Sequence, residues 1–381
     1  MGDAADIGTS KAAAALAAAR RVTVKIGSSL LIDGEGGARH DWLASVGADI
    51  AALREAGKQV VVVSSGAVAL GRRHLGLKRS TRLDHKQAAA AAGQALLMQA
   101  WERAMAPHAI PTAQLLLTLD DTEQRQRALN ARATIDVLLT QGGLPVINEN
   151  DSVAVDELRY GDNDRLSARV AQLVHSDVLI LLSDVDGLFT ADPSRDKAAS
   201  LIEDVPTITD EIEAAAGGTG TAGVGTGGMR TKVQAARIAV GAGCATIIAS
   251  GHGESPIGRL AAGGPATIFT ATGAPGRAYK RWIAGTLSPG GQVTIDDGAA
   301  RALALGKSLL PKGVTGIEGS FERGACLRVL NAEGIEVARG IVAYSAAEAR
   351  LILGGGSADI SERLGYAGPD ELIHRDDLVM L

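Results

Sequence analysis

Two lysines of this sequence are flanked by small residues in a way that suits phosphate binding. Lys25 stands in the segment VKIGSS (24–29), at the end of the apolar run Val22–Ile26. Lys232 follows the glycine-rich segment Gly217–Gly228, just inside a helical pattern. Glycine lets backbone N–H groups approach an anion closely, and a helix N-terminus attracts phosphate. For Lys25 alone, a surface lysine is an equally good interpretation. The glycine-rich segment could be a flexible linker, but its position before a helix and its paired Thr and Lys favour an anion site.

Polar residues also follow two further apolar runs. The segment SSGA (64–67) follows the run Gln59–Val63 and opens a helical pattern, which suits either simple N-capping or carboxylate binding. Asn148–Asp151 follows the apolar run Leu144–Ile147, and a second polar cluster spans residues 161–165. Such amides and carboxylates could bind an ammonium group, coordinate Mg²⁺ or position lysines. A solvated loop with Asx turns is the alternative.

Several other motif matches lack the neighbouring secondary structure that the motif requires. Gly223–Gly228 fits GxGxxG, but no strand immediately precedes it. Gly306–Ser308 resembles the end of a P-loop but lies in a β-rich region. The seven histidines show no metal-ligand spacing, and no nucleophile–base pair is evident.

Lysines, phosphate loops and acidic groups without a nucleophile favour phosphoryl transfer, which depends on positioning and charge neutralisation.

Alternating strand and helix patterns must position these residues. Strands are expected at Val22–Ile26, Gln59–Val63, Pro111–Leu117, Pro145–Ile147, Val178–Leu182, Thr246–Ala249 and Ala266–Phe269. Helices are expected at Asp41–Glu55, His85–Met105, Asp121–Leu139, Asp164–Val174 and Met229–Val240. The alternation predicts an α/β fold, with a mainly parallel sheet sandwiched by helices. Ligands of such sheets lie beyond the carboxyl ends of the strands, where the unusual residues fall.

The chain of 381 residues is long enough for two domains. We expect an N-terminal arm over 1–20, a catalytic domain over 21–272 and a linker over 273–289. Residues 290–368 then form a small β-rich domain, and 369–381 a C-terminal tail. Strands of the second domain are expected at Gly291–Ile295, Gly313–Glu318, Ala325–Leu330 and Glu336–Tyr344, with few helices between them.

Composition limits the class of protein. The net charge is −5, and residues 291–381 carry 9 Lys and Arg against 13 Asp and Glu, so nucleic acid is not an expected partner. Two distant cysteines, Cys244 and Cys326, suit a reducing compartment and a cytoplasmic location. Since no uncharged apolar stretch reaches about 18 residues, we expect no membrane span.

The segments together resemble the amino acid kinase family, and most closely its glutamate 5-kinase branch. The matching motifs occur in the family's order across residues 21–270: VKIGSS, VVVSSGAVALG, PVINENDSV, GDNDRLSA, LLSDVDGLFTADP and GTGGMRTK. Residues 290–368 resemble the PUA domain that follows in that branch. The resemblance therefore implies the amino acid kinase fold with a PUA-like domain.

The resemblance also implies residue roles. Lys25 and Lys232 would stabilise the transferring phosphoryl group, with Asp164 orienting both lysines. Glutamate would be held by Ser65, Asp151 and Asn163. ATP would be bound by Lys25, Ser183, Asp184, Thr226, Gly227, Gly228, Met229, Arg230, Thr231 and Lys232. No residue is assigned to a metal.

The implied reaction is ATP- and Mg²⁺-dependent phosphorylation of the γ-carboxylate of L-glutamate, the first step of proline biosynthesis. The resemblance further implies allosteric feedback inhibition by proline and a homo-oligomer. A family member acting on acetylglutamate, aspartate or a nucleoside monophosphate is one alternative. An RNA-binding or regulatory protein that acts through the PUA-like domain is another.

Overall fold

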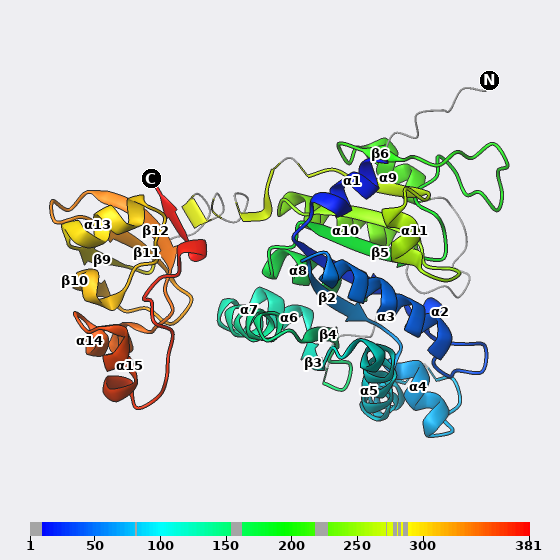
Figure 1. Ribbon diagram of the computed structural model, residues 1–381, viewed down its shortest axis with the longest axis horizontal. Coiled ribbons are helices and arrows are strands. Elements are labelled where there is room, and N and C mark those ends of the chain that lie inside the picture. Colours follow the sequence, from blue (N-terminus) through cyan, green and yellow to red (C-terminus); the bar gives the residue numbers. More distant parts are fainter. Residues whose placement is uncertain are drawn as a thin grey trace. The chain divides into compact units, whose positions relative to one another are not determined.

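The computed structural model describes residues 10–80, 82–153, 162–217, 228–271, 273–276, 280, 283–284 and 289–381. The chain divides into two compact units, Met1–Pro275 and Gly276–Leu381, each with its own hydrophobic core (Figure 1). Among the described residues, no helix is long and apolar enough to cross a membrane.

The first unit is built on an eight-stranded sheet. Its strands are β1 Arg21–Ile26, β2 Gln59–Ser64, β3 Thr112–Leu117, β4 Leu144–Glu149, β5 Val178–Ser183, β6 Asp204–Val205, β7 Ala245–Ser250 and β8 Ala266–Phe269. The strand order is β3-β4-β2-β1-β5-β7-β8-β6, and every neighbouring pair is parallel except β7 and β8. The prediction of a mainly parallel sheet is confirmed.

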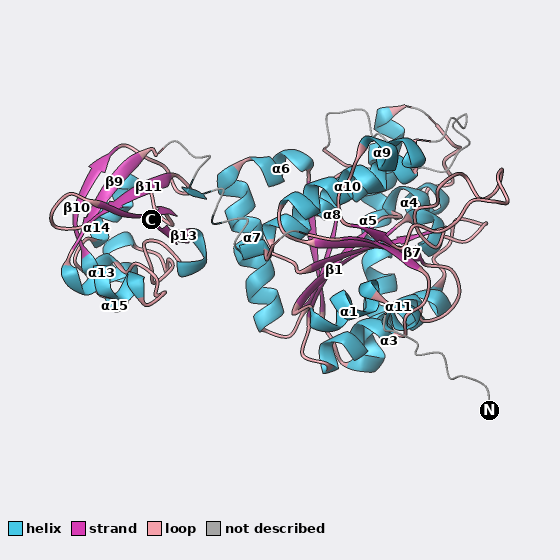
Figure 2. Ribbon diagram, turned by 90° about the horizontal axis from the view of Figure 1, so that it is seen from above, coloured by secondary structure: helices cyan, strands magenta, loops and turns pink. Residues whose placement is uncertain are grey.

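Helices cover both faces of this sheet. They are α1 Lys11–Ala18, α2 Ser28–Leu31, α3 His40–Glu55, α4 Ala67–His74, α5 Leu83–Met105, α6 Leu119–Glu123, α7 Arg125–Thr140, α8 Asp162–Leu173, α9 Asp210–Ala216, α10 Met229–Gly241 and α11 Pro256–Ala261. Figure 2 shows α1, α3 and α11 on one side of the strands and α8 and α10 on the other. Alternate residues of β2 enter opposite cores, Val60 and Val62 on one face and Val61 and Val63 on the other. Burial on both faces explains why the strands are continuously apolar.

Two segments of the first unit differ from the sequence-based expectation. The predicted helix over Asp121–Leu139 is two helices, α6 and α7, because Gln124 between them has an extended backbone. Thr118 caps α6 in a reciprocal hydrogen-bonded pair with Asp121. Within the segment expected as an arm, α1 packs its Leu16 into the main core, with 1% of that residue exposed.

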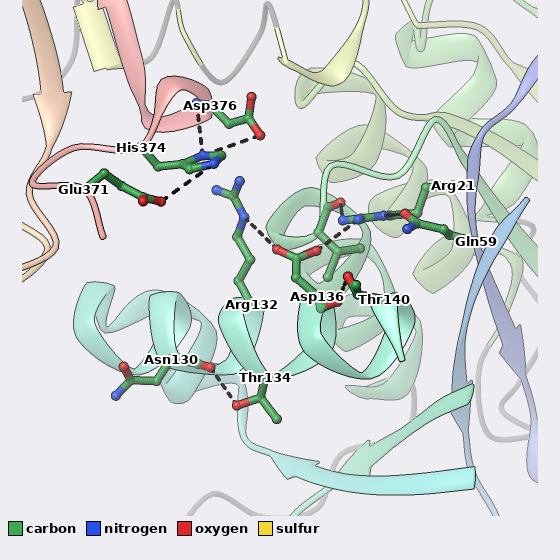
Figure 3. A network of polar contacts seen from close by, with 11 residues as sticks. Arg21, Gln59, Asn130, Arg132, Thr134, Asp136, Thr140, Glu371, His374 and Asp376 are labelled. Atoms are coloured by element: carbon green, nitrogen blue, oxygen red, sulfur yellow. Dashed lines mark hydrogen bonds and ion pairs between the residues drawn. The ribbon is translucent and has the colours of Figure 1, made fainter. Parts of the chain in front are cut away.

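A polar network joins the amino end of β1 to α7 (Figure 3). The Arg21 guanidinium lies 2.9 Å from the carboxylate of Asp136 and donates to Gln59 on β2 at 2.8 Å. Arg132 approaches the other oxygen of Asp136 at 3.6 Å. Since this network holds the amino ends of the strands, it is structural and leaves the carboxyl ends available for a ligand.

Over residues 289–381, the second unit is a five-stranded sheet of order β10-β9-β11-β12-β13, and helices α13, α14 and α15 contribute to its core. Its elements are β9 Gly291–Ile295, α13 Asp297–Ala304, β10 Val314–Gly319, β11 Cys326–Leu330, β12 Glu336–Ile341, α14 Ala346–Ile352, α15 Ser357–Leu364 and β13 Leu378–Met380. The strand β13 falls in the segment expected as a tail and pairs with β12. These helices have seven or eight residues each, and the sequence pattern, which indicated few helices, did not predict them.

Candidate active site

The carboxyl ends of β1, β2, β4 and β5 border one large cavity of about 1090 Å³. Its lining comes from these strand ends, from parts of α4, α5, α8, α9 and α10, and from the loops after α4 and β5. A volume of this size exceeds that of most single-ligand pockets, so it can hold a nucleotide and a small acceptor together.

Three buried charged groups meet at this cavity. Asp164 on α8 is completely buried, and its two carboxylate oxygens face different lysines. The ammonium nitrogen of Lys25 on β1 lies 2.5 Å from Oδ1, and that of Lys232 on α10 lies 3.4 Å from Oδ2. The hydroxyl of Thr231 donates to Oδ2 at 2.7 Å. Three elements that are remote in the sequence thus bring two cations and one anion together.

The sequence places these groups through local structure. Lys25 faces the cavity because β1 ends one residue later at Ile26 and is followed by Gly27. Helix α10 begins at Met229, immediately after Gly228, so Lys232 lies in its first turn. Burial of Lys232, only 6% exposed, directs its long side chain inward to Asp164 rather than to solvent.

The pKa values reflect this arrangement. Burial by itself would raise the pKa of Asp164, but the charges of Lys25 and Lys232 outweigh it and hold that pKa below its usual value. Burial lowers the pKa of Lys232, as does the charge of Lys25, while Asp164 opposes both effects. The buried carboxylate of Asp164 thus stays ionised and favours the charged form of Lys232.

Hydrogen-bonding groups form another part of the cavity lining. Ser65 and Gly66 follow β2, and Gly66 has a φ of 117°, which favours glycine. In the described part of the chain, Nδ2 and Oδ1 of Asn148 and Oδ1 of Asn163 are buried and have no hydrogen-bond partner. Both asparagines line the cavity, as does Asp151. Buried amide atoms without a partner are costly, so their presence indicates a polar ligand that satisfies them.

Comparison with known proteins agrees with this site. A sequence profile of the Amino acid kinase family matches residues 20–250, more than half of the chain. The chain belongs to the amino acid kinase family. A profile of the PUA domain matches residues 291–364 of this kinase.

Three relatives of the kinase match its sequence over almost the full length of both chains. Glutamate 5-kinase of Caulobacter vibrioides (strain NA1000 / CB15N) is 56% identical over 376 residues, which is 98% of this chain and 99% of the relative. Glutamate 5-kinase of Paramagnetospirillum magneticum is 54% identical, covering 96% of this chain and 99% of the relative. Glutamate 5-kinase 1 of Rhizobium meliloti is 54% identical, covering 97% of this chain and 94% of the relative.

Most of the residues predicted to bind ligands line this one cavity of the kinase. Those that do are Lys25, Ser65, Asp151, Asn163, Asp164, Ser183, Asp184, Gly228, Met229 and Lys232. Arg230 is exposed and Thr231 contacts Asp164, and neither belongs to the cavity lining. Thr226 and Gly227 lie outside the described residues. The assigned roles remain predictions, but nearly all of the described residues that carry them share one site.

Sequence reasoning did not single out a basic segment of the kinase that lines the same cavity. It comprises Arg72, Lys78, Arg79 and Lys86, around the C-terminal end of α4 and the start of α5. The signal was available as the run KRSTR shortly after the SSGA segment. These cations raise the positive potential of the cavity, which favours anionic ligands.

Proposed function

We propose that this amino acid kinase transfers the γ-phosphoryl group of ATP to the γ-carboxylate of L-glutamate, giving γ-glutamyl phosphate and ADP. The observation that carries the proposal is the convergence of Lys25 and Lys232 on Asp164 at one end of a cavity with room for two ligands. The glutamate 5-kinases that it matches at 54–56% identity supply the acceptor. The product is an intermediate on the way to proline.

The two lysines are suited to phosphoryl transfer. Negative charge is spread over the oxygens of the transferred group, and preorganised cations in a dry site stabilise it strongly. Asp164 fixes both ammonium groups without ligand, so little reorganisation is needed when ATP binds. The acceptor is a carboxylate, which is already ionised at neutral pH, and the reaction needs no general base.

The acceptor end supplies donors and acceptors for an amino acid. The Asp151 carboxylate can bind the α-ammonium group, and the amides of Asn148 and Asn163 can bind a carboxylate or ammonium group. Ser65 and the first turn of α4 add a hydroxyl and backbone N–H groups. Together they would hold glutamate with its γ-carboxylate directed at the lysines.

The nucleotide would occupy the other end, near Ser183, Asp184 and the start of α10 at Gly228 and Met229. No group of three or more His, Cys, Asp or Glu in the described part of the chain could hold a metal ion by itself. Mg²⁺ usually keeps several waters and binds through substrate phosphates plus one or two carboxylates. It would therefore enter with ATP, and Asp184 is a carboxylate placed at the same end.

Regulation and assembly are part of the same proposal. Proline, the end product, would inhibit by binding at the acceptor end, and the protein would act as a homo-oligomer in the cytoplasm. Resemblance to the family supports these statements. Both cysteines are free and buried, which suits a reducing compartment. Competition between proline and glutamate in steady-state kinetics tests the first statement, and light scattering tests the second.

A coupled assay tests the reaction. The purified protein with ATP, Mg²⁺ and glutamate should release ADP, and hydroxylamine should trap the acyl phosphate as a hydroxamate. Acetylglutamate, aspartate and UMP serve as competing acceptors and should give much lower rates. Folded protein that forms no hydroxamate from glutamate would overturn the proposal, and a faster rate with another acceptor would reassign the substrate.

A further inference from the structure

The acceptor end of the cavity is supported from behind by the long helix α5. Trp101 of this helix is completely buried, and its indole N–H donates to the hydroxyl of Ser64 at 3.0 Å. The Ser64 hydroxyl in turn donates to the carbonyl oxygen of Ser65 at 3.3 Å. A chain of two hydrogen bonds thus runs from the core to the peptide that joins Ser65 to Gly66.

This chain fixes the direction of that peptide. In a trans peptide the carbonyl oxygen and the following N–H point in opposite directions. Since the carbonyl of Ser65 is turned toward the Ser64 hydroxyl, the N–H of Gly66 is turned away from it. Gly66 lines the cavity and precedes α4, whose first N–H groups have no partner within the helix.

The crossing of α4 and α5 holds the same segment in place. A Cβ atom on Gly71 of α4 would lie 1.8 Å from the carbonyl oxygen of Ala89 on α5. A Cβ atom on Gly93 of α5 would lie 1.8 Å from the carbonyl oxygen of Ala67, the first residue of α4. The two backbones touch at this crossing, and no side chain fits between them.

We propose that Trp101 is a positioning residue for acceptor binding, which acts through Ser64 to orient the Ser65–Gly66 peptide. The glycine crossing at Gly71 and Gly93 keeps α4 where that peptide requires it. The inference rests on the proposed function, because it assigns the peptide to the acceptor. Neither Trp101 nor either glycine touches a substrate. A second observation points to a ligand here, since the buried amide of Asn148 lines the same cavity without a partner among the described residues.

Trp101→Phe tests the proposal with little loss of volume. Loss of one buried neutral hydrogen bond weakens an interaction by about three- to tenfold. We expect the KM for glutamate to rise by about that factor, while the KM for ATP stays within about twofold. Trp42→Phe is the matched control, because Trp42 is also buried and its indole donates to the carbonyl of Gly251 at 2.8 Å. It should leave the KM for glutamate unchanged.

Variants of Ser64 separate orientation from general stability. Ser64→Ala should reproduce the effect of Trp101→Phe, whereas Ser64→Thr keeps the hydroxyl and should behave like the unmodified protein. The double variant Trp101→Phe/Ser64→Ala should be no worse than the more impaired single variant, because both changes break the same chain. An unchanged KM for glutamate in Trp101→Phe, or equal increases in both KM values, would overturn the proposal.

Gly71→Ala provides an independent perturbation of the helix crossing. Its methyl group must push α4 from α5, so the KM for glutamate should rise by about tenfold or more. Gly241→Ala on α10 is the control, because a Cβ atom there would meet nothing within 4 Å. If Gly71→Ala does not fold, the KM for glutamate of Trp101→Phe still tests the proposal. Absence of glutamate phosphorylation in the unmodified protein would contradict the proposed function, while normal kinetics in Trp101→Phe would contradict only this inference.

Discussion

Replacing Asp164 with asparagine removes the charge between the two buried lysines and keeps the shape of the side chain. In the protein, the ammonium groups of Lys25 and Lys232 lie 2.5 and 3.4 Å from the carboxylate oxygens. The side chains of the two lysines are 8% and 7% exposed, so water cannot replace the lost partner. Breaking a buried ion pair typically costs about 3–5 kcal/mol. We expect Asp164→Asn to lower the free energy of unfolding by this amount.

The same substitution should change the pH dependence of activity. Burial already lowers the pKa of Lys232, and the charge of Asp164 opposes this, so the pKa of Lys232 should fall further in the variant. A neutral lysine cannot stabilise the transferred phosphoryl group. Turnover should fall by at least about 100-fold near pH 8. It should partly recover as the pH is lowered toward about 6.5, because protonation restores the charge of Lys232.

Hydroxamate formation across this pH range and chemical denaturation together measure both effects. Asp136→Asn is the matched control, because Asp136 also pairs with an arginine from another element, Arg21, but lies at the amino end of the sheet. It should lower stability modestly and leave turnover unchanged. Normal turnover in a folded Asp164→Asn variant would refute the reasoning, as would a loss of activity that lower pH makes worse.

Four further predictions follow from particular contacts. Lys25→Ala removes a cation from the site and should lower turnover by about 10²–10³-fold, and near-normal hydroxamate formation in a folded variant would exclude that role. Thr231→Val removes the hydroxyl that donates to Asp164 and should lower kcat by about tenfold with little change in either KM; a selective rise in the KM for glutamate would contradict this. Burial and the charges of Arg132 and Arg21 lower the pKa of His175 in the folded protein to about 3. Below about pH 6.5 the unfolded chain therefore binds a proton at His175 that the folded protein does not, and the free energy of unfolding falls as the pH drops. Denaturation should show a loss of about 2 kcal/mol between pH 7 and pH 5, and His175→Asn, which tolerates the φ of 53°, should reduce that loss; equal slopes would show that other groups are responsible. Truncation after Pro275 removes the second unit but leaves the first core complete, and the product should still form hydroxamate within about threefold of the full chain. Complete loss of activity in a folded truncated protein would show that the second unit is needed for catalysis.

Much of the first unit could be predicted because its strands are buried on both faces. The apolar run Val178–Leu182 predicts a strand, and the structure extends it by one residue, to Ser183. The two-residue strand β6, Asp204–Val205, is too short to give a pattern. Likewise, β13 becomes a strand only because β12 offers it hydrogen-bonding partners. Elements that depend on a distant neighbour leave no periodic signal in their own residues.

The sequence could predict which residues form the candidate site, but not which of their atoms contact one another. Motif order indicated that Lys25, Asp164 and Lys232 act together, but spacing alone could not show that Asp164 gives one oxygen to each lysine. The contribution of Trp101 had no signal, because an isolated tryptophan within an alanine-rich helix is typical of a core residue. Its partner, Ser64, is 37 positions away in the sequence.

All eight strands of the first sheet lie before Pro275, and none of the described residues after it adds a strand to this sheet. Domains generally fold in order as they leave the ribosome, at about 5–20 residues per second. The first unit can therefore close its sheet roughly 5–20 seconds before translation of the chain ends. During that interval the nascent chain already has the groups proposed to bind nucleotide. If they do, ATP would stabilise the newly folded unit before the second one exists.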